Sequence, residues 1–322
     1  MARPMPLEIP TSYSSLSLQR IALSHVPASS KTATPVILLT LNRPEKNNAF
    51  EDTMMQEIES VYRLFDLDER VKVIVFTGAG KMFCAGWDLE LGFPGGNTSK
   101  TGTGNTIKEK DQEHRDSGGR AVLAIHRCRK PTIMAVNGHA AGIGATIQLP
   151  AVIRIATASA KIGFVFSRRG VVMEACSSYF LPRLIGLSRA LHLTTTGLTC
   201  PASDPLLREL YSEIVPTPQK CIERALEIAD DIAKNTSLLS SYLMKEMMYR
   251  DMGSAEGQHL LDSRIISAMY GGPDNVEGVK SFFEKRPGKF TSTLEENAPG
   301  CYPWWQEVNT ASKAQVAGKS KM

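Results

Sequence analysis

The sequence predicts an α/β fold, and three observations support this prediction. Short apolar runs bounded by turn residues alternate with segments whose apolar residues recur at helical spacing. From about residue 188 onward the chain becomes predominantly helical. With 322 residues, 42% of them apolar and 22% charged, the chain can bury a substantial core. Strands that alternate with helices are typical of βαβ crossovers.

The N-terminal elements follow in order along the chain. Residues 1–15 are predicted to form a flexible arm, and residues 16–26 and 36–41 are strand-like. Pro44 ends the second strand, because proline cannot donate to a ladder. Residues 71–77 predict a buried strand that a glycine-rich turn closes. Between these strands the apolar residues at helical spacing are Met54, Ile58, Val61, Tyr62 and Phe65.

The remaining segments complete the predicted domain organisation. Residues 92–105 are rich in glycine, serine, threonine and asparagine, and a loop of this length inside a domain is usually functional or mobile. The expected later elements are a helix over 107–128, strands over 132–136 and 152–156, and helices over 218–235, 238–250 and 254–270. We therefore divide the chain into a core (16–200), a helical region (201–290) and a tail (291–322).

Composition and charge exclude several classes of protein. The net charge of +4 is modest; it suits a pocket for an anionic ligand and equally no particular role. The chain has no apolar run of membrane-spanning length, no secretory signal and no strong basic tract, so we expect neither a membrane span nor a nucleic-acid partner. The six cysteines and six histidines form no metal-binding pattern, which favours reduced intracellular thiols and no bound metal.

Two turns with small residues each follow a predicted strand. They lie in KMFCAGWDLEL, residues 81–91, and in MAVNGHAAGIGATIQL, residues 134–149. Small residues let a backbone pass close to a ligand, and free N–H groups at a helix start suit an oxyanion. One such turn alone would be weak support. The third segment, IGFVFSRRGVVMEACSSYFLPRLIG at residues 162–186, places one glutamate among apolar residues.

Together these three segments resemble the crotonase superfamily of enoyl-CoA hydratases and isomerases, over about residues 16–290. The resemblance implies a ClpP/crotonase-like fold, which is a spiral of ββα repeats with a helical C-terminal trimerisation region. It implies an acyl-CoA thioester substrate and a homotrimer or hexamer. It implies no separate cofactor, because CoA is part of the substrate. Phe282 and Phe283 match the closing helix of the family, and we expect them to be core residues.

The resemblance also implies roles for residues in the two turns. The main-chain N–H groups of Ala85 and Ile143 would stabilise the thioester enolate. Peroxisomal isomerases carry a large aliphatic residue at the second position, where most hydratases have glycine. Alternatively, both segments are only tight turns, and Asp88 caps one of them. The substrate-binding candidates are Arg43, Lys46, Ala49, Cys84, Gly86, Asp88 and Gly142.

The acidic residues distinguish between reactions of the family. At the two positions where hydratases carry glutamates, this chain has Thr146 and Phe166. Glu174 follows eight residues after Phe166 and resembles the catalytic glutamate of peroxisomal Δ3,Δ2-enoyl-CoA isomerases. We expect the neighbouring Val171, Val172 and Met173 to desolvate this carboxyl and raise its pKa towards that of a useful base.

The predicted function is therefore isomerisation of a 3-enoyl-CoA to the 2-trans-enoyl-CoA by one carboxylate. One alternative is an enoyl-CoA hydratase of fatty-acid β-oxidation or of a specialised pathway such as toxin or siderophore assembly. Another is a non-catalytic crotonase-fold scaffold or RNA-binding protein. The terminal residues Ser320, Lys321 and Met322 are a close variant of a peroxisomal signal, unless a lysine-rich tail ends this way by chance. They predict a peroxisomal location and an import receptor as partner.

Overall fold

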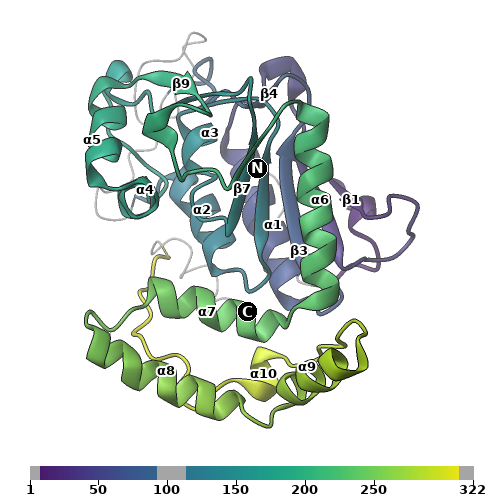
Figure 1. Ribbon diagram of the computed structural model, residues 1–322. Coiled ribbons are helices and arrows are strands. Elements are labelled where there is room, and N and C mark those ends of the chain that lie inside the picture. The colour runs from purple at the N-terminus through teal and green to yellow at the C-terminus, as the bar shows by residue number, and fades with distance from the viewer. Residues whose placement is uncertain (1–7, 93–113, 312–322) are drawn as a thin grey trace, which may run out of the picture.

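The computed structural model describes residues 8–92 and 114–311. It has two β-sheets, helices on both faces of the larger sheet, and a group of helices below them in Figure 1. The α/β fold predicted from the sequence is confirmed. The loop expected over 92–105, except its first residue, lies outside the described residues, as do the first part of the helix expected over 107–128 and the terminal tripeptide 320–322.

The larger sheet has six strands in the order β1-β2-β3-β5-β7-β10. Strand β1 pairs antiparallel with β2, and the other pairs are parallel. Two of the strands predicted from the sequence, 36–41 and 132–136, have the expected bounds, whereas the first strand is shorter than expected. The bounds are Ile21–His25 (β1), Val36–Leu41 (β2), Val73–Gly78 (β3), Thr132–Val136 (β5), Ile153–Thr157 (β7) and Glu213–Val215 (β10).

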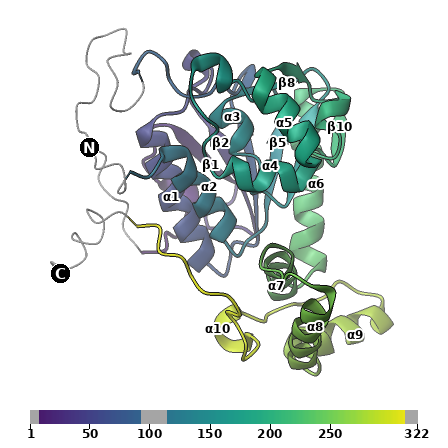
Figure 2. The same ribbon diagram turned by 90° about the vertical axis from the view of Figure 1, so that its left-hand side faces the viewer.

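Alternating side chains of this sheet face two different helical layers. On β3, Ile74 and Phe76 pack with helices α1 (Asp52–Leu67) and α2 (Ser117–Arg127). Val73 and Val75 of the same strand pack on the opposite face, against α6 (Pro218–Asn235). Figure 2 shows α1 and α2 on one side of the sheet and α6 on the other. The central strands are buried on both faces, as parallel strands between helices usually are.

The smaller sheet has the order β4-β6-β8-β9. Its first three strands are parallel, so the chain leaves all three at the same edge of the sheet. Their bounds are Met82–Cys84 (β4), His139–Ala141 (β6), Lys161–Gly163 (β8) and Thr199–Pro201 (β9). The helices around this sheet are α3 (Ile143–Thr146), α4 (Ser177–Ile185) and α5 (Leu187–Thr196). Short 3-10 helices cover Tyr13–Ser15, Pro44–Lys46, Ser167–Arg169 and Pro205–Leu207.

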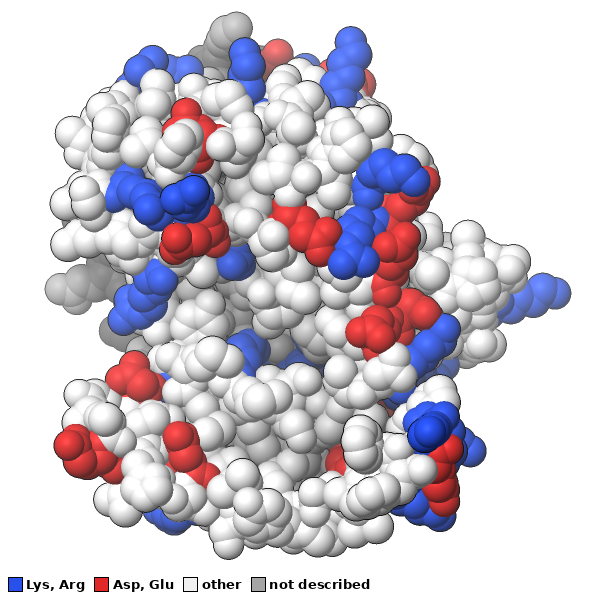
Figure 3. Space-filling view, in the orientation of Figure 1, with Lys and Arg blue, Asp and Glu red and all other residues white. Residues whose placement is uncertain are grey.

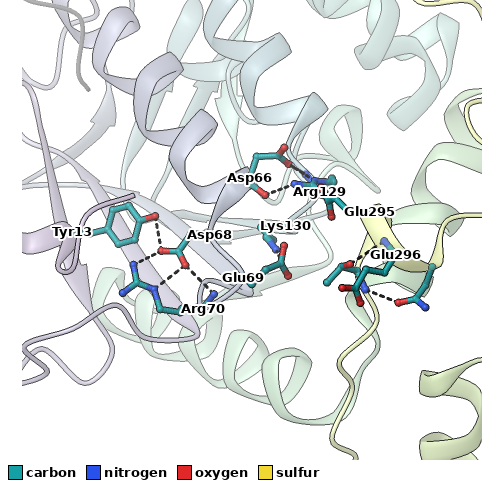
Figure 4. Close-up of polar contacts among 11 residues, drawn as sticks. Tyr13, Asp66, Asp68, Glu69, Arg70, Arg129, Lys130, Glu295 and Glu296 are labelled. Carbon is teal, nitrogen blue, oxygen red and sulfur yellow. Dashed lines mark hydrogen bonds and ion pairs between the residues drawn. The ribbon is translucent and has the colours of Figure 1, made fainter. Parts of the chain in front are cut away.

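The predicted domain boundaries need correction at both ends of the core. Tyr13 was assigned to the flexible arm, but its ring is fully buried and its hydroxyl donates to Asp68 at 3.0 Å (Figure 4). Strand β10 and helix α6 pair with and pack against the sheet, although they lie beyond residue 200. The core therefore extends to about residue 235, and the separate helical region begins at α7 (Leu238–Tyr249).

The C-terminal helices form a small cluster of their own. They are α7 (Leu238–Tyr249), α8 (Ala255–Met269), α9 (Pro273–Glu284) and α10 (Leu294–Asn297). Leu243 of α7 and Leu261 of α8 are buried in this cluster. The segment after residue 290 packs back onto the molecule: Arg129 binds both Asp66 and Glu295 (Figure 4). Up to residue 311, the predicted tail is therefore part of the folded structure.

The C-terminal region and the surface can be compared with the expectations from the sequence. Phe282 and Phe283 were expected in the core, but their exposed fractions are 77% and 76%. On the face shown in Figure 3, acidic and basic side chains are interspersed. Within residues 8–92 and 114–311, no helix is long and apolar enough to cross a membrane and no group of side chains could hold a metal ion.

A cavity of about 280 Å³ lies where the amino ends of the strands meet the C-terminal helices. Lys72 and Lys130, which precede strands β3 and β5, line it together with Tyr242 of α7. The ammonium group of Lys130 lies 3.6 Å from the Glu69 carboxylate (Figure 4). None of the residues that line this cavity is a candidate for the site described next.

Candidate active site

The two turns identified in the sequence lie side by side. Strands β4 and β6 are parallel neighbours, and the chain leaves both at the same edge. A Cβ added to Gly86 would lie 2.9 Å from the carbonyl oxygen of Ala141, and one added to Gly144 would lie 2.2 Å from that of Cys84. Gly142 has a φ of +54°, which a residue with a side chain rarely adopts. Glycine is therefore required for the two backbones to approach so closely.

Several main-chain N–H groups in these turns, among them those of Ile143 and Trp87, make no main-chain hydrogen bond within the described part of the chain. Ile143 is the first residue of α3, where an N–H has no partner inside the helix. Trp87 forms a parallel bridge with Phe50. The two hydrogen bonds of this bridge are made by the Gly86 carbonyl and the Asp88 N–H, so the Trp87 N–H is free. Ala85, which the sequence nominated, donates its N–H to the carbonyl of Asn47 at 3.1 Å. This bond argues against Ala85 as the first enolate donor and leaves Trp87 in its place.

Three of the predicted substrate-binding residues, Arg43, Ala49 and Asp88, instead make buried contacts with one another beneath the first turn. The Arg43 guanidinium lies 2.9 Å from the Asp88 carboxylate and donates to the Ala49 carbonyl at 2.8 Å. All three residues are buried. The Cys84 side chain is buried as well, whereas Lys46 is at the surface and pairs with Glu90 at 2.6 Å. Lys46 is thus the member of the predicted set whose charged group lies near the surface.

The sequence analysis missed one residue that fixes this turn, Asn48. Its side-chain oxygen accepts from the N–H of Arg43, and its amide nitrogen donates to the carbonyls of Ala79 and Met82, both at 2.8 Å. Asn48 has a φ of 53° and is fully buried. Asparagine tolerates this left-handed conformation better than most residues, which was the available sequence signal.

The Glu174 carboxylate lies between the first turn of α2 and the short helix α3. Its Oε1 atom accepts a hydrogen bond from the Thr146 hydroxyl at 2.7 Å. A Cβ added to Gly118 would lie 1.8 Å from its Oε2 atom and 2.8 Å from the Cδ1 atom of Ile143. The carboxylate is therefore close to the side chains of Ile143 and Thr146, which both belong to α3. The other hydratase position, Phe166, is a buried core residue.

Burial raises the pKa of the Glu174 carboxyl to about 7. The hydrogen bond from Thr146 opposes this shift, and the negative charge of Asp116 adds to it. The rise of the pKa agrees with the expectation from the sequence, but the neighbouring Val172 is 84% exposed, so the expectation that this side chain desolvates the carboxyl is wrong. Met173 packs against the main core as expected. A carboxyl with a pKa near 7 can both accept and return a proton at neutral pH.

The backbone that follows Glu174 is strained. Ala175 and Cys176 have φ angles of 56° and 54°, a region that costs about 1–3 kcal/mol for a residue with a side chain. The Glu174 carbonyl accepts from the Ser177 N–H at 3.0 Å, at the start of α4. The Ala175 N–H donates to the Asp116 carboxylate at 3.0 Å. Such strain persists only where the surroundings fix it, and it is concentrated at functional sites.

Comparison with known proteins identifies the family of the chain. Residues 31–293 match the enoyl-CoA hydratase/isomerase family, and the chain belongs to this family. It is 46% identical, over 82% of its length and 85% of the relative, to the enoyl-CoA hydratase ACTT3 of Alternaria alternata. It is 28% identical to the 1,2-epoxyphenylacetyl-CoA isomerase of Escherichia coli, over 85% of this chain and 99% of that protein.

The solved structures give the same result for the fold. A probable enoyl-CoA hydratase/isomerase from Mycobacterium abscessus superimposes with a TM-score of 0.71 at 28% identity. The match covers 82% of this chain and 98% of that protein. The crotonase fold inferred from the three sequence segments is thereby confirmed.

Proposed function

We propose that the protein is an enoyl-CoA isomerase that moves a double bond from C3 to C2 of an acyl-CoA thioester. The observation that carries the proposal is the Glu174 carboxylate, which lies beside the Ile143 side chain of α3 and whose pKa is raised to about 7. Thr146 and Phe166 occupy the positions where hydratases of the family have acids. One carboxylate suffices to move a double bond, because the proton removed from C2 can be returned at C4.

The steps follow from the arrangement of these groups. Glu174 takes the proton from C2 of the 3-enoyl thioester, and the electron pair moves onto the thioester oxygen. The N–H groups of Trp87 and Ile143 stabilise this enolate by hydrogen bonds. Glu174 then delivers the same proton to C4, and the double bond forms between C2 and C3. Since Thr146 holds Oε1, we assign the proton transfer to Oε2, which lies beside Ile143.

Replacement of Glu174 tests this proposal. Glu174→Gln keeps the shape and can accept the Thr146 hydrogen bond, but it cannot take up the C2 proton. Isomerisation should fall by about 10²–10⁴-fold, with little change in thioester binding. Exchange of the C2 proton with deuterated solvent should fall in parallel. The matched control is Glu227→Gln on the exposed face of α6. Near wild-type turnover by Glu174→Gln would rule the mechanism out.

Hydration of a 2-enoyl-CoA is the second candidate function. It is favoured by the Alternaria alternata relative, which is named an enoyl-CoA hydratase and is 46% identical to this chain. In that case Glu174 would act on a water molecule. Parallel assays on 3-enoyl-CoA and 2-enoyl-CoA separate the two candidates. Rapid formation of 3-hydroxyacyl-CoA with negligible isomerisation would favour the hydratase, and no turnover of either substrate would favour a scaffold.

We also propose that the protein acts in peroxisomes as a homotrimer or hexamer. The terminal tripeptide Ser320, Lys321 and Met322 and the family resemblance support these two proposals. A fluorescent protein at the N-terminus should enter peroxisomes, and deletion of the tripeptide should leave it in the cytosol. Identical distributions of the two fusions would contradict the location. Light scattering of the purified protein would measure the assembly.

A further inference from the structure

The Asp116 carboxylate joins the start of α2 to the segment that carries Glu174. It is the N-cap residue of α2, and its Oδ2 atom accepts the N–H of Gly119 at 2.6 Å. The same oxygen accepts the N–H of Ala175 at 3.0 Å. Ala175 directly follows Glu174, so one carboxylate oxygen connects the helix to the main chain of the proposed acid–base residue.

The Glu174 main chain is also fixed from the opposite side. Its carbonyl accepts from the N–H and the hydroxyl of Ser177, which begins α4. Between these two attachments lie the left-handed residues Ala175 and Cys176. A left-handed pair without glycine relaxes unless bonds on both sides hold it. Asp116 supplies the bond on the α2 side, and Gly118 of the same helical turn adjoins the carboxylate itself.

We propose that Asp116 is a positioning residue that holds Glu174 at the substrate through the Ala175 N–H. This inference rests on the proposed function, in which Glu174 carries the proton. Asp116 does not touch the reacting atoms in this assignment. The alternative is that Asp116 only caps α2, as aspartate does at many helix starts. A shorter residue at position 116 distinguishes the two roles. It can still accept from the Gly119 N–H and cap α2, but it cannot reach the Ala175 N–H.

The charge of Asp116 gives a second way to distinguish the roles. The titratable groups that act on Glu174 or respond to it are Asp116 of α2, Cys84 of β4 and Cys176 before α4. Burial raises the pKa of both thiols, so they are neutral at pH 7. The negative charge of Asp116 raises the pKa of Glu174. Removal of this charge should therefore lower the pKa that limits kcat on the acid side.

The test compares two variants of Asp116 in the full-length protein. Asp116→Ser keeps a good N-cap but is too short to reach Ala175; kcat should fall by up to about 10²-fold while KM changes little. Asp116→Asn keeps an acceptor without the charge; it should retain more activity, and its acid limb should move to lower pH. The control is Thr217→Ala, which removes the side-chain cap of α6 and should reduce thermal stability without changing kcat or the acid limb.

The outcomes separate this inference from the proposed function. Wild-type kcat and an unshifted acid limb in folded Asp116→Ser, with Glu174→Gln inactive, would reduce Asp116 to a helix cap and overturn the inference alone. Full activity of Glu174→Gln would overturn the proposed function, and the inference would fall with it. If Asp116→Ser loses kcat and Asp116→Asn shifts the acid limb, a purely structural role is excluded.

Discussion

The Glu174 region and the C-terminal helices differ in how much of their surface other residues of the same chain cover. Around Glu174, hydrogen bonds from Thr146 and Ser177 fix the side chain and the carbonyl, and Gly118 closes one side. On α9, by contrast, Phe282 and Phe283 are more than three-quarters exposed. The first region is held from several elements of one chain, whereas the second presents apolar side chains to solvent.

This difference predicts that the two regions respond differently to mutation. At the site, small displacements should affect catalysis strongly, because proton transfer depends on reach before it depends on pKa. In the C-terminal helices, buried residues should affect stability, and exposed residues should matter only where another surface covers them. The predictions below test this separation, beginning with the largest expected effect.

The first prediction concerns the free N–H of Ile143. Ile143→Pro removes this donor, and proline is tolerated at the first position of a helix, which Ile143 occupies in α3. Loss of one such donor typically lowers kcat by about 10²–10³-fold. Ile143→Gly keeps the N–H and should retain far more activity. Steady-state kinetics of the two variants, both shown to be folded by circular dichroism, give the comparison.

Equal activities of the proline and glycine variants would contradict the assignment of a main-chain donor at this position. If both variants were equally inactive, the Ile143 side chain would be the important group, since its Cδ1 atom lies near Gly118. Only a selective loss in the proline variant supports the N–H itself.

The second prediction concerns the space beside the Glu174 carboxylate. In Gly118→Ala the new methyl group would lie 1.8 Å from Oε2, so the carboxylate must move. A displacement of about 1 Å can cost about 10²-fold in rate. Gly278→Ala in α9 is the control, because its new Cβ would meet the Phe290 ring at 3.6 Å, an ordinary contact. Wild-type kcat in Gly118→Ala would show that the carboxylate tolerates displacement.

The third prediction concerns pH. Since the pKa of Glu174 is about 7 in the folded protein and its ordinary value is 4.5, kcat should rise tenfold per pH unit below pH 7 and level off above it. The raised pKa also stabilises the folded state below pH 4.5, and this contribution is lost as the pH rises through 7. As the pH rises from 5 to 8, the wild type should therefore lose thermal stability relative to Glu174→Gln, which carries no titrating group at this position. A constant difference across that range would mean that Glu174 has an ordinary pKa.

The sequence predicted the parts of the molecule that local patterns determine. Apolar runs located the strands, and the helix over residues 218–235 has the bounds that its spacing predicted. The glycines made the two turns visible, whereas the roles of the turns and of Glu174 followed from the resemblance to the crotonase superfamily. The sequence could not show whether Ala85 or Trp87 offers the free N–H group, because this depends on which of them donates to the Asn47 carbonyl. Non-local hydrogen bonds of this kind leave no periodic signal.

The smallest expected effect is on α9, where the sequence suggested core residues and the structure shows exposed ones. Phe282→Ser changes a side chain that is 77% exposed, so the free energy of unfolding should change by no more than about 0.5 kcal/mol. Leu243→Ala, in the buried cluster of α7 and α8, should lower it by about 2–5 kcal/mol. Chemical denaturation at two protein concentrations measures both. A large, concentration-dependent loss in Phe282→Ser would contradict this expectation and show that another copy of the chain covers this face in solution. A loss that does not depend on concentration would instead place Phe282 in the core of the single chain, as the sequence pattern suggested.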